Sequence, residues 1–371
     1  MNICIVAGAR PNFIKVAPIV HSIEKAKEQG RDINFNLVYA GCENDPTLEE
    51  TLFKDLQLNR PDVYLGVDCV NLNELTGQVM SAFEAYLQTT PTDVVIVVDD
   101  LASTLAAAIV TKKQGLLLAH LVAGTRSFDI KMPKEINRLV IDGLSDLLFT
   151  AGIGSNSIAT REGVELSHIY MVGNILMDTL RYNRNRLIRP ALFDTLNLSP
   201  KNYLVFTLNR KALIHNSDNL QRMIAQMIAQ AGSTPIVAPL RNAAAQAVNT
   251  CLQQLGGSAS FHIVEPLSYL QFGYLTTHAQ GIITDSGNVA EEATFNGVPC
   301  ITLNSYTEHI ETVKQGTNLL VGEDAEALAA AVKDMVGGQW KASSLPDRWD
   351  GRTADRIISI LLDYSSHSLS V

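Results

Sequence analysis

Hydrophobic and polar positions alternate along this chain with two periods, one typical of buried strands and one typical of amphipathic helices. In the first half, short runs of aliphatic residues occupy positions 3–6, 34–40, 93–98 and 116–122. The run at 93–98, DVVIVV, is apolar at almost every position, which indicates a parallel strand buried on both faces. Segments with helical spacing, such as 13–30 and 72–87, separate these runs. This order predicts an α/β fold, a parallel sheet wrapped by helices with ligands at the carboxyl ends of its strands.

The alternation stops once and then starts again, which predicts two domains. Ile188-Arg189-Pro190 interrupts the pattern and is a candidate linker. Further apolar runs follow it at 203–208, 234–238, 261–264, 299–303 and 318–321. Two domains are also the usual expectation for 371 residues. We expect a first domain at 1–188 and a second, nucleotide-binding domain at 189–350, with a C-terminal helix at 351–366 that packs back on the first.

Composition excludes several classes of protein. The net charge is −9, which argues against broad nucleic-acid binding. No apolar run reaches the ~18 residues that a membrane span needs. The five cysteines are scattered and the eight histidines lack metal-ligand spacing. We therefore expect a cytoplasmic protein with reduced thiols and with no metal.

The stretch 281–297 carries the clearest binding signal. An apolar strand ends in Thr284-Asp285-Ser286-Gly287, and a helix begins immediately afterwards. Free N–H groups and the positive end of the helix dipole at such a turn bind anions, and Ser286 can add a hydroxyl. Glu292 lies farther along the helix, where a carboxylate could bind ribose hydroxyls. The alternative is that Ser286 is an ordinary helix cap and Gly287 an ordinary turn glycine.

Candidate cations follow the first predicted strand. Arg10 lies in the predicted loop and Lys15 in the helix after it, where both could neutralise a diphosphate. The alternative for Arg10 is a solvated loop arginine.

Candidate acids and bases lie elsewhere in the chain. Asp100 follows the strand at 93–98 and could be an acid, a base or a helix cap. Glu135 and Arg138 are three residues apart and could simply pair with each other. His215 could be a catalytic base or a cap.

Several stretches together resemble one family, the non-hydrolysing bacterial UDP-N-acetylglucosamine 2-epimerases, over nearly the whole chain. They include GARPNFIKVAPIV (8–20), STLAAA (103–108), PKEINR (133–138), ITDSGNVAEEA (283–293) and DGRTADRI (350–357). The resemblance implies a GT-B fold, which has two doubly wound Rossmann-like domains and a UDP-sugar in the interdomain cleft. It also implies a homodimer with no metal or redox cofactor.

The family's chemistry is an isomerisation. UDP is eliminated from UDP-N-acetylglucosamine (UDP-GlcNAc) to give a 2-acetamidoglucal, and its re-addition gives UDP-N-acetylmannosamine (UDP-ManNAc). In an epimerase, Asp100, which matches a family aspartate, and Glu135 would carry the proton transfers, with His215 as a further candidate. The resemblance further implies UDP binding by the residues that match the family's phosphate and ribose positions, which are Arg10, Lys15, Ser286, Gly287 and Glu292. Asp285, in the same turn as Ser286, is a further candidate for UDP binding.

The chain departs from the family pattern at several positions. Val122 and Lys134 replace family glutamates, Leu208 replaces a histidine and Asn304 replaces an arginine. Valine and leucine cannot transfer a proton, and lysine reverses the local charge. Two alternatives to the epimerase are therefore a catalytically degenerate UDP-sugar-binding or partner protein, and a GT-B glycosyltransferase.

Overall fold

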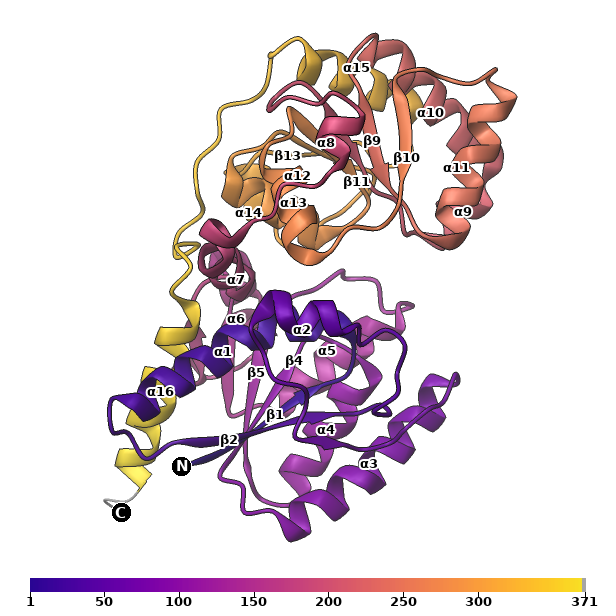
Figure 1. Ribbon diagram of the computed structural model, residues 1–371. Coiled ribbons are helices and arrows are strands. Elements are labelled where there is room, and N and C mark those ends of the chain that lie inside the picture. The colour runs from indigo at the N-terminus through magenta and orange to yellow at the C-terminus, as the bar shows by residue number, and fades with distance from the viewer. Residues whose placement is uncertain (369–371) are drawn as a thin grey trace. The chain divides into compact units, whose positions relative to one another are not determined.

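The computed structural model describes residues 1–368 and divides the chain into two compact units (Figure 1). The first unit contains Met1–Tyr182 and the segment that begins at Asp347. The second unit is Asn183–Pro346. The first unit is therefore built from two separate parts of the chain.

A seven-stranded parallel sheet forms the centre of the first unit, in the order β3-β2-β1-β4-β5-β6-β7. Strand β1 pairs with β2 on one side and with β4 on the other, so the strand order reverses between β1 and β4. The strands are β1 (Asn2–Ala7), β2 (Asn34–Tyr39), β3 (Val63–Tyr64), β4 (Val94–Val98), β5 (Leu117–Ala123), β6 (Leu147–Thr150) and β7 (Ile169–Met171).

Helices cover both faces of this sheet. One face packs against α3, α4 and α5 around a core that includes Val6, Phe83 and Val97. The C-terminal helix α16, yellow in Figure 1, packs on α1, and the Ser22 hydroxyl donates to Asp355 Oδ1 at 2.9 Å. The helices are α1 (Arg10–Glu28), α2 (Glu50–Leu56), α3 (Leu72–Thr89), α4 (Ala102–Lys113), α5 (Pro133–Leu144), α6 (Ile153–Arg161), α7 (Ile175–Asn183) and α16 (Thr353–Ser368).

The second unit repeats this plan with a six-stranded parallel sheet in the order β10-β9-β8-β11-β12-β13. Its strand order reverses between β8 and β11. The strands are β8 (Leu204–Phe206), β9 (Ile236–Pro239), β10 (Phe261–Val264), β11 (Gly281–Thr284), β12 (Cys300–Thr302) and β13 (Asn318–Leu320). The helices are α8 (Leu192–Thr195), α9 (Lys211–His215), α10 (Ser217–Ala231), α11 (Asn242–Gln254), α12 (Tyr269–Thr277), α13 (Gly287–Asn296), α14 (Glu311–Lys314) and α15 (Ala325–Val336).

Helix α1 begins earlier than the apolar spacing predicts. It starts at Arg10, so Arg10 belongs to the first helical turn and the prediction of a loop position was wrong. The cause is Asn12, whose Oδ1 accepts the N–H groups of Gly8 at 2.9 Å and Ala9 at 3.2 Å. Pro11 is also compatible with a first turn, because the N–H that it lacks would have no helical partner there.

Candidate functional site

The candidate residues gather where the strand order reverses in each sheet. In a doubly wound sheet, loops diverge to opposite faces at this point and leave a crevice at the carboxyl ends of the two strands. In the first unit, the turn after β1 begins at Gly8 and the turn after β4 contains Asp99 and Asp100. In the second unit, Asn209 follows β8 and Asp285 follows β11.

Asp99 ties the turn after β4 to helix α1. Its carboxylate accepts from Lys15 Nζ at 2.6 Å and from Asn12 Nδ2 at 2.9 Å. Its backbone has a φ of 58°, in the left-handed region that few non-glycine residues adopt. Lys15 is 7% exposed, so this cation is held inside the first unit by Asp99. Diphosphate binding by Arg10 and Lys15 stays a prediction.

Asp100 lies between two cations of helix α5. Its Oδ2 accepts from Arg138 Nε at 2.8 Å, and Lys134 Nζ lies 3.2 Å from its Oδ1. Burial alone would raise the pKa of Asp100, but Lys134 and Arg138 outweigh it and hold the pKa below its ordinary value. Helix α4 begins after Leu101 without a side-chain cap. Asp100 is therefore an ionised carboxylate beside two cations and not a helix cap.

Glu135 holds the loop that follows β5. Its Oε2 accepts from the N–H and the hydroxyl of Ser127, both at 2.9 Å, and its Oε1 accepts from the N–H of Phe128 at 2.9 Å. Arg138 Nη1 adds a contact of 3.1 Å to Oε2. Burial opposes ionisation, but the N–H groups of Ser127 and Phe128 outweigh it and lower the pKa of Glu135. Glu135 thus accepts four hydrogen bonds, three on Oε2 and one on Oε1.

A buried chain of charges supports the same edge, and the pattern of residues alone did not point to it. His120 Nδ1 lies 2.6 Å from Asp142 Oδ1, and Asp142 Oδ2 lies 2.8 Å from Arg126 Nη1. The other ring nitrogen of His120 lies 2.9 Å from the carbonyl oxygen of Asp99. The network therefore reaches the same turn that carries Asp100.

Val122 occupies a distorted position at the end of β5. Its φ is 71° and the pairing of β5 with β6 shifts between Leu121 and Ala123. A β-branched residue in the left-handed region is strained. The position matched to a family glutamate is thus apolar here and has an unusual backbone conformation.

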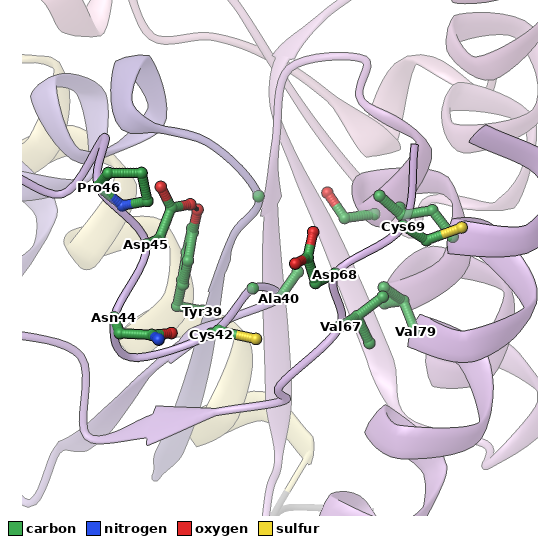
Figure 2. A pocket seen from close by; sticks show the side chains of 14 residues that line it. Tyr39, Ala40, Cys42, Asn44, Asp45, Pro46, Val67, Asp68, Cys69 and Val79 are labelled. Carbon is green, nitrogen blue, oxygen red and sulfur yellow. Dashed lines mark hydrogen bonds between the residues drawn. The ribbon is translucent and has the colours of Figure 1, made fainter. Parts of the chain in front are cut away.

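A cavity of about 380 Å³ lies in the first unit beside the turn after β1. Figure 2 shows its walls, where the Tyr39 hydroxyl donates to Asp45 Oδ2 at 2.5 Å. Its lining contains two carboxylates and two thiols but no lysine, arginine or histidine, so it does not suit a diphosphate. The lining residues are Gly8, Tyr39, Ala40, Gly41, Cys42, Asn44, Asp45, Pro46, Val67, Asp68, Cys69, Leu75, Val79 and Ser103.

In the second unit, Asp285 joins the two turns at the strand-order reversal. Its Oδ2 accepts from the N–H groups of Asn209 at 2.6 Å and Arg210 at 2.5 Å, while its buried Oδ1 has no partner within residues 1–368. Ser286 precedes helix α13, and its side chain makes no cap hydrogen bond. A Cβ at Gly287 would meet nothing nearer than Glu291 Oε1 at 4.0 Å. The helix N-terminus therefore has an open approach and uncapped N–H groups.

Glu292 is a buried carboxyl group that no described residue engages. It is 7% exposed, and no hydrogen bond or ion pair reaches it from residues 1–368. Burial and the neighbouring Glu291 raise the pKa of Glu292 to about 8. The buried hydroxyl of Tyr269 likewise has no partner in the described chain. Such groups are costly unless a ligand or water satisfies them.

His215 lies apart from these networks. It is the last residue of α9, where it is exposed, and Asn216 caps the following helix. The alternative that His215 is a helix cap was therefore wrong, because Asn216 is the cap. Residues 1–368 contain no group of three or more His, Cys, Asp or Glu side chains able to hold a metal ion. Within the same range, no helix has the length and apolar character needed to cross a bilayer.

Two doubly wound parallel α/β units in one chain, each with its candidate residues at the strand-order reversal, define the GT-B fold class. Solved structures support this assignment. The crystal structure of Methanocaldococcus jannaschii UDP-GlcNAc 2-epimerase in complex with UDP-GlcNAc and UDP matches with a TM-score of 0.82 and 31% identity, over 97% of this chain and 99% of that one. The Neisseria meningitidis enzyme bound to UDP-GlcNAc, 22% identical, shows the same fold with a TM-score of 0.86, over 98% and 100%.

Sequence comparison gives the family. A sequence profile of UDP-N-acetylglucosamine 2-epimerase matches residues 25–362. The M. jannaschii UDP-N-acetylglucosamine 2-epimerase is 32% identical over 97% of this chain and 99% of its own length. A UDP-N-acetylglucosamine 2-epimerase homolog of Methanococcus maripaludis is 33% identical over 88% of this chain and 90% of its own. The chain belongs to the UDP-N-acetylglucosamine 2-epimerase family, as the sequence motifs predict.

Proposed function

We propose that this protein binds UDP-GlcNAc or a related UDP-sugar and interconverts its C2 epimers by elimination and re-addition of UDP. The similarity to the M. jannaschii enzyme over nearly the full length of both chains supports this reaction. The best support from the geometry comes from the carboxyl edge of the sheet in the second unit. There a helix N-terminus, the unengaged Glu292 carboxyl and the partnerless Tyr269 hydroxyl occur together.

We assign the UDP end of the ligand to this edge. The uncapped N–H groups of α13 suit a phosphate, because the helix dipole and the free donors both favour negative charge. Ribose hydroxyls can donate to Glu292, which removes the cost of leaving its carboxyl group unengaged. Gly287 gives the phosphate room to approach the backbone.

Asp100 is our candidate for the group that moves the proton. Elimination transfers the C2 proton of the sugar to a carboxylate while the C1–O bond to UDP breaks, which gives the 2-acetamidoglucal. Re-addition reverses both changes on the other face of C2. Asp100 is contacted by the side chains of Lys134 and Arg138, whereas Glu135 also accepts the backbone N–H groups of Ser127 and Phe128 and so holds the loop after β5. We therefore assign Glu135 a positioning role, and exposed His215 remains a candidate without described partners.

One observation favours a second function, in which the UDP-sugar is bound but not epimerised. Val122 is apolar, and Lys134 lies 3.2 Å from the oxygen of Asp100 that Arg138 Nε does not contact. A carboxylate beside two cations is a weaker base than a solvated one. Loss of one general acid or base typically costs ~10²–10⁴-fold in rate, so activity well below that of other members is expected.

Incubation with UDP-GlcNAc in deuterated water, followed by NMR, separates the two functions. Epimerisation predicts deuterium at C2 of the recovered UDP-sugar together with UDP-ManNAc, and Asp100→Asn abolishes both. Calorimetric binding of UDP without any C2 exchange at high protein concentration identifies a binding protein. Sugar transfer to an acceptor without C2 exchange identifies a glycosyltransferase.

We also propose that the protein is a cytoplasmic homodimer. Helix α5 supports a self-association surface, because Ile136, Leu139 and Val140 are 42%, 38% and 37% exposed on it. Sedimentation velocity tests the stoichiometry. A dimer that becomes monomeric in Val140→Lys supports the proposal, and a monomer at all concentrations rejects it.

A further inference from the structure

The loop between β5 and α5 is rigid although it lies on the surface. Glu135 binds the N–H groups of Ser127 and Phe128, each at 2.9 Å. Asp129 closes the rest of the loop, because its Oδ1 accepts from the N–H of Lys131 at 3.0 Å and its carbonyl oxygen accepts from Met132 at 2.9 Å. The backbone of this loop is therefore fixed before any ligand arrives.

Phe128 is held in this loop in an unfavourable conformation. Its φ is 60°, in the left-handed region, where a bulky residue is a genuine outlier. Its side chain is nevertheless 73% exposed, so burial of the ring does not compensate for the strain. Glycine would fit this backbone better. A strained conformation that the surrounding structure enforces is typical of functional positions.

Hydrogen bonds and an ion pair connect Phe128 to the candidate catalytic carboxylate. The N–H of Phe128 binds Glu135, Glu135 contacts Arg138 at 3.1 Å, and Arg138 Nη2 contacts Asp100 at 2.7 Å. Asp99 and Val122, at the ends of neighbouring strands, also have a backbone φ in the left-handed region, as Phe128 does. The backbone of Phe128 is thus connected to the edge of the sheet where Asp100 lies.

We propose that Phe128 is a substrate-contacting residue whose ring packs against the apolar face of the sugar in a UDP-sugar. An exposed aromatic ring at a fixed position suits the C–H groups of a pyranose, and packing there would bury apolar area on both partners. This inference rests on the proposed function. It adds a specificity residue for the sugar moiety of the ligand.

The variant Phe128→Gly separates binding from folding. Because glycine accepts the left-handed backbone, we expect the thermal midpoint of Phe128→Gly to be unchanged or raised by roughly 2 °C. Calorimetry is expected to show roughly tenfold weaker binding of UDP-GlcNAc, as for loss of a stacking aromatic ring, with unchanged binding of UDP. Phe128→Tyr, which keeps the ring, is expected to bind UDP-GlcNAc like the wild type.

A matched control is Asn197→Gly. Asn197 is also exposed, is not glycine and has a φ of 52°, but it belongs to the second unit after α8. The variant Asn197→Gly should leave the binding of UDP and of UDP-GlcNAc unchanged. If Phe128→Gly binds UDP-GlcNAc as tightly as the wild type does, the inference is overturned. It is also overturned if the affinity for UDP falls as much as the affinity for UDP-GlcNAc, because the ring would then contact the nucleotide. If the wild-type protein does not bind UDP, the proposed function is contradicted as well. This outcome distinguishes failure of the proposed function from failure of the inference about Phe128 alone.

Discussion

The carboxyl edges of the two sheets differ in how completely their carboxylates are engaged. In the first unit, Asp99, Asp100 and Glu135 are each held by cations or N–H groups. In the second unit, Glu292 has no partner within residues 1–368, and neither does Asp285 Oδ1. The carboxylates of the first edge are therefore positioned before any ligand binds. In the second unit, Glu292 and Asp285 Oδ1 need a ligand or water as a hydrogen-bond partner. Binding energy should come mainly from the second unit and positioning mainly from the first.

The largest expected effect comes from breaking the buried charge chain of the first unit. Asp142→Ala leaves His120 and Arg126 without their shared carboxylate, and removal of one partner from a buried pair costs about 3–5 kcal/mol. Urea unfolding monitored in the first unit measures this loss. Glu50→Ala, at the exposed pair with Arg60, is the control and should change little. An equally small effect of Asp142→Ala contradicts the view that this edge is held by its ion pairs.

The second effect is a pH dependence of stability in the second unit. The folded pKa of Glu292 is about 8, above the ordinary value of 4.5. Its neutral form therefore stabilises the fold below pH 4.5, and this contribution is lost as pH rises through about 8. Since one pKa unit corresponds to about 1.4 kcal/mol, Glu292→Gln should remove a loss on the order of a few kcal/mol between pH 4.5 and about 8. If the free energy of unfolding changed with pH in the same way in the wild type and in Glu292→Gln over this range, the raised pKa of Glu292 would be ruled out.

The smallest effect concerns the balance of charge around Asp100. Lys134→Met removes one of its two cations, so the pKa of Asp100 should rise toward its ordinary value. The rise should be small, because the Lys134 side chain is 56% exposed and screened by water. Carbon-13 NMR titration of the Asp100 carboxyl measures it, with Asp100→Asn for assignment. Lys131→Met removes a charge three residues earlier in the chain and is the control. An equal rise in the pKa of Asp100 in Lys131→Met would contradict a specific role for Lys134.

The sequence predicted the architecture because parallel strands and helices leave distinct apolar periods. The run at 93–98 becomes β4, and the turn at 284–287 connects β11 to α13. Family motifs predicted the GT-B fold class, which the solved structures confirm.

The pairing of side chains could not be predicted in the same way. Lys15 reaches Asp99 across 84 positions, a contact that exists only because the strand order places β4 beside β1. Nor does apolar spacing reveal the left-handed backbone of Phe128, since hydrogen bonds to Glu135 hold that loop. Sequence periodicity reports burial, whereas these features depend on contacts between distant segments.

The most direct test of the account is a calorimetric titration of UDP into the wild-type protein and Glu292→Gln. Measurements at pH 7 in buffers of different ionisation enthalpy also count released protons. The account predicts that the wild-type protein binds UDP and releases close to one proton, because ribose hydroxyls favour the ionised carboxylate. Glu292→Gln should bind roughly tenfold more weakly or worse, without that proton. Equal affinity and proton release in the two proteins, or no binding to the wild type, would contradict the central claim.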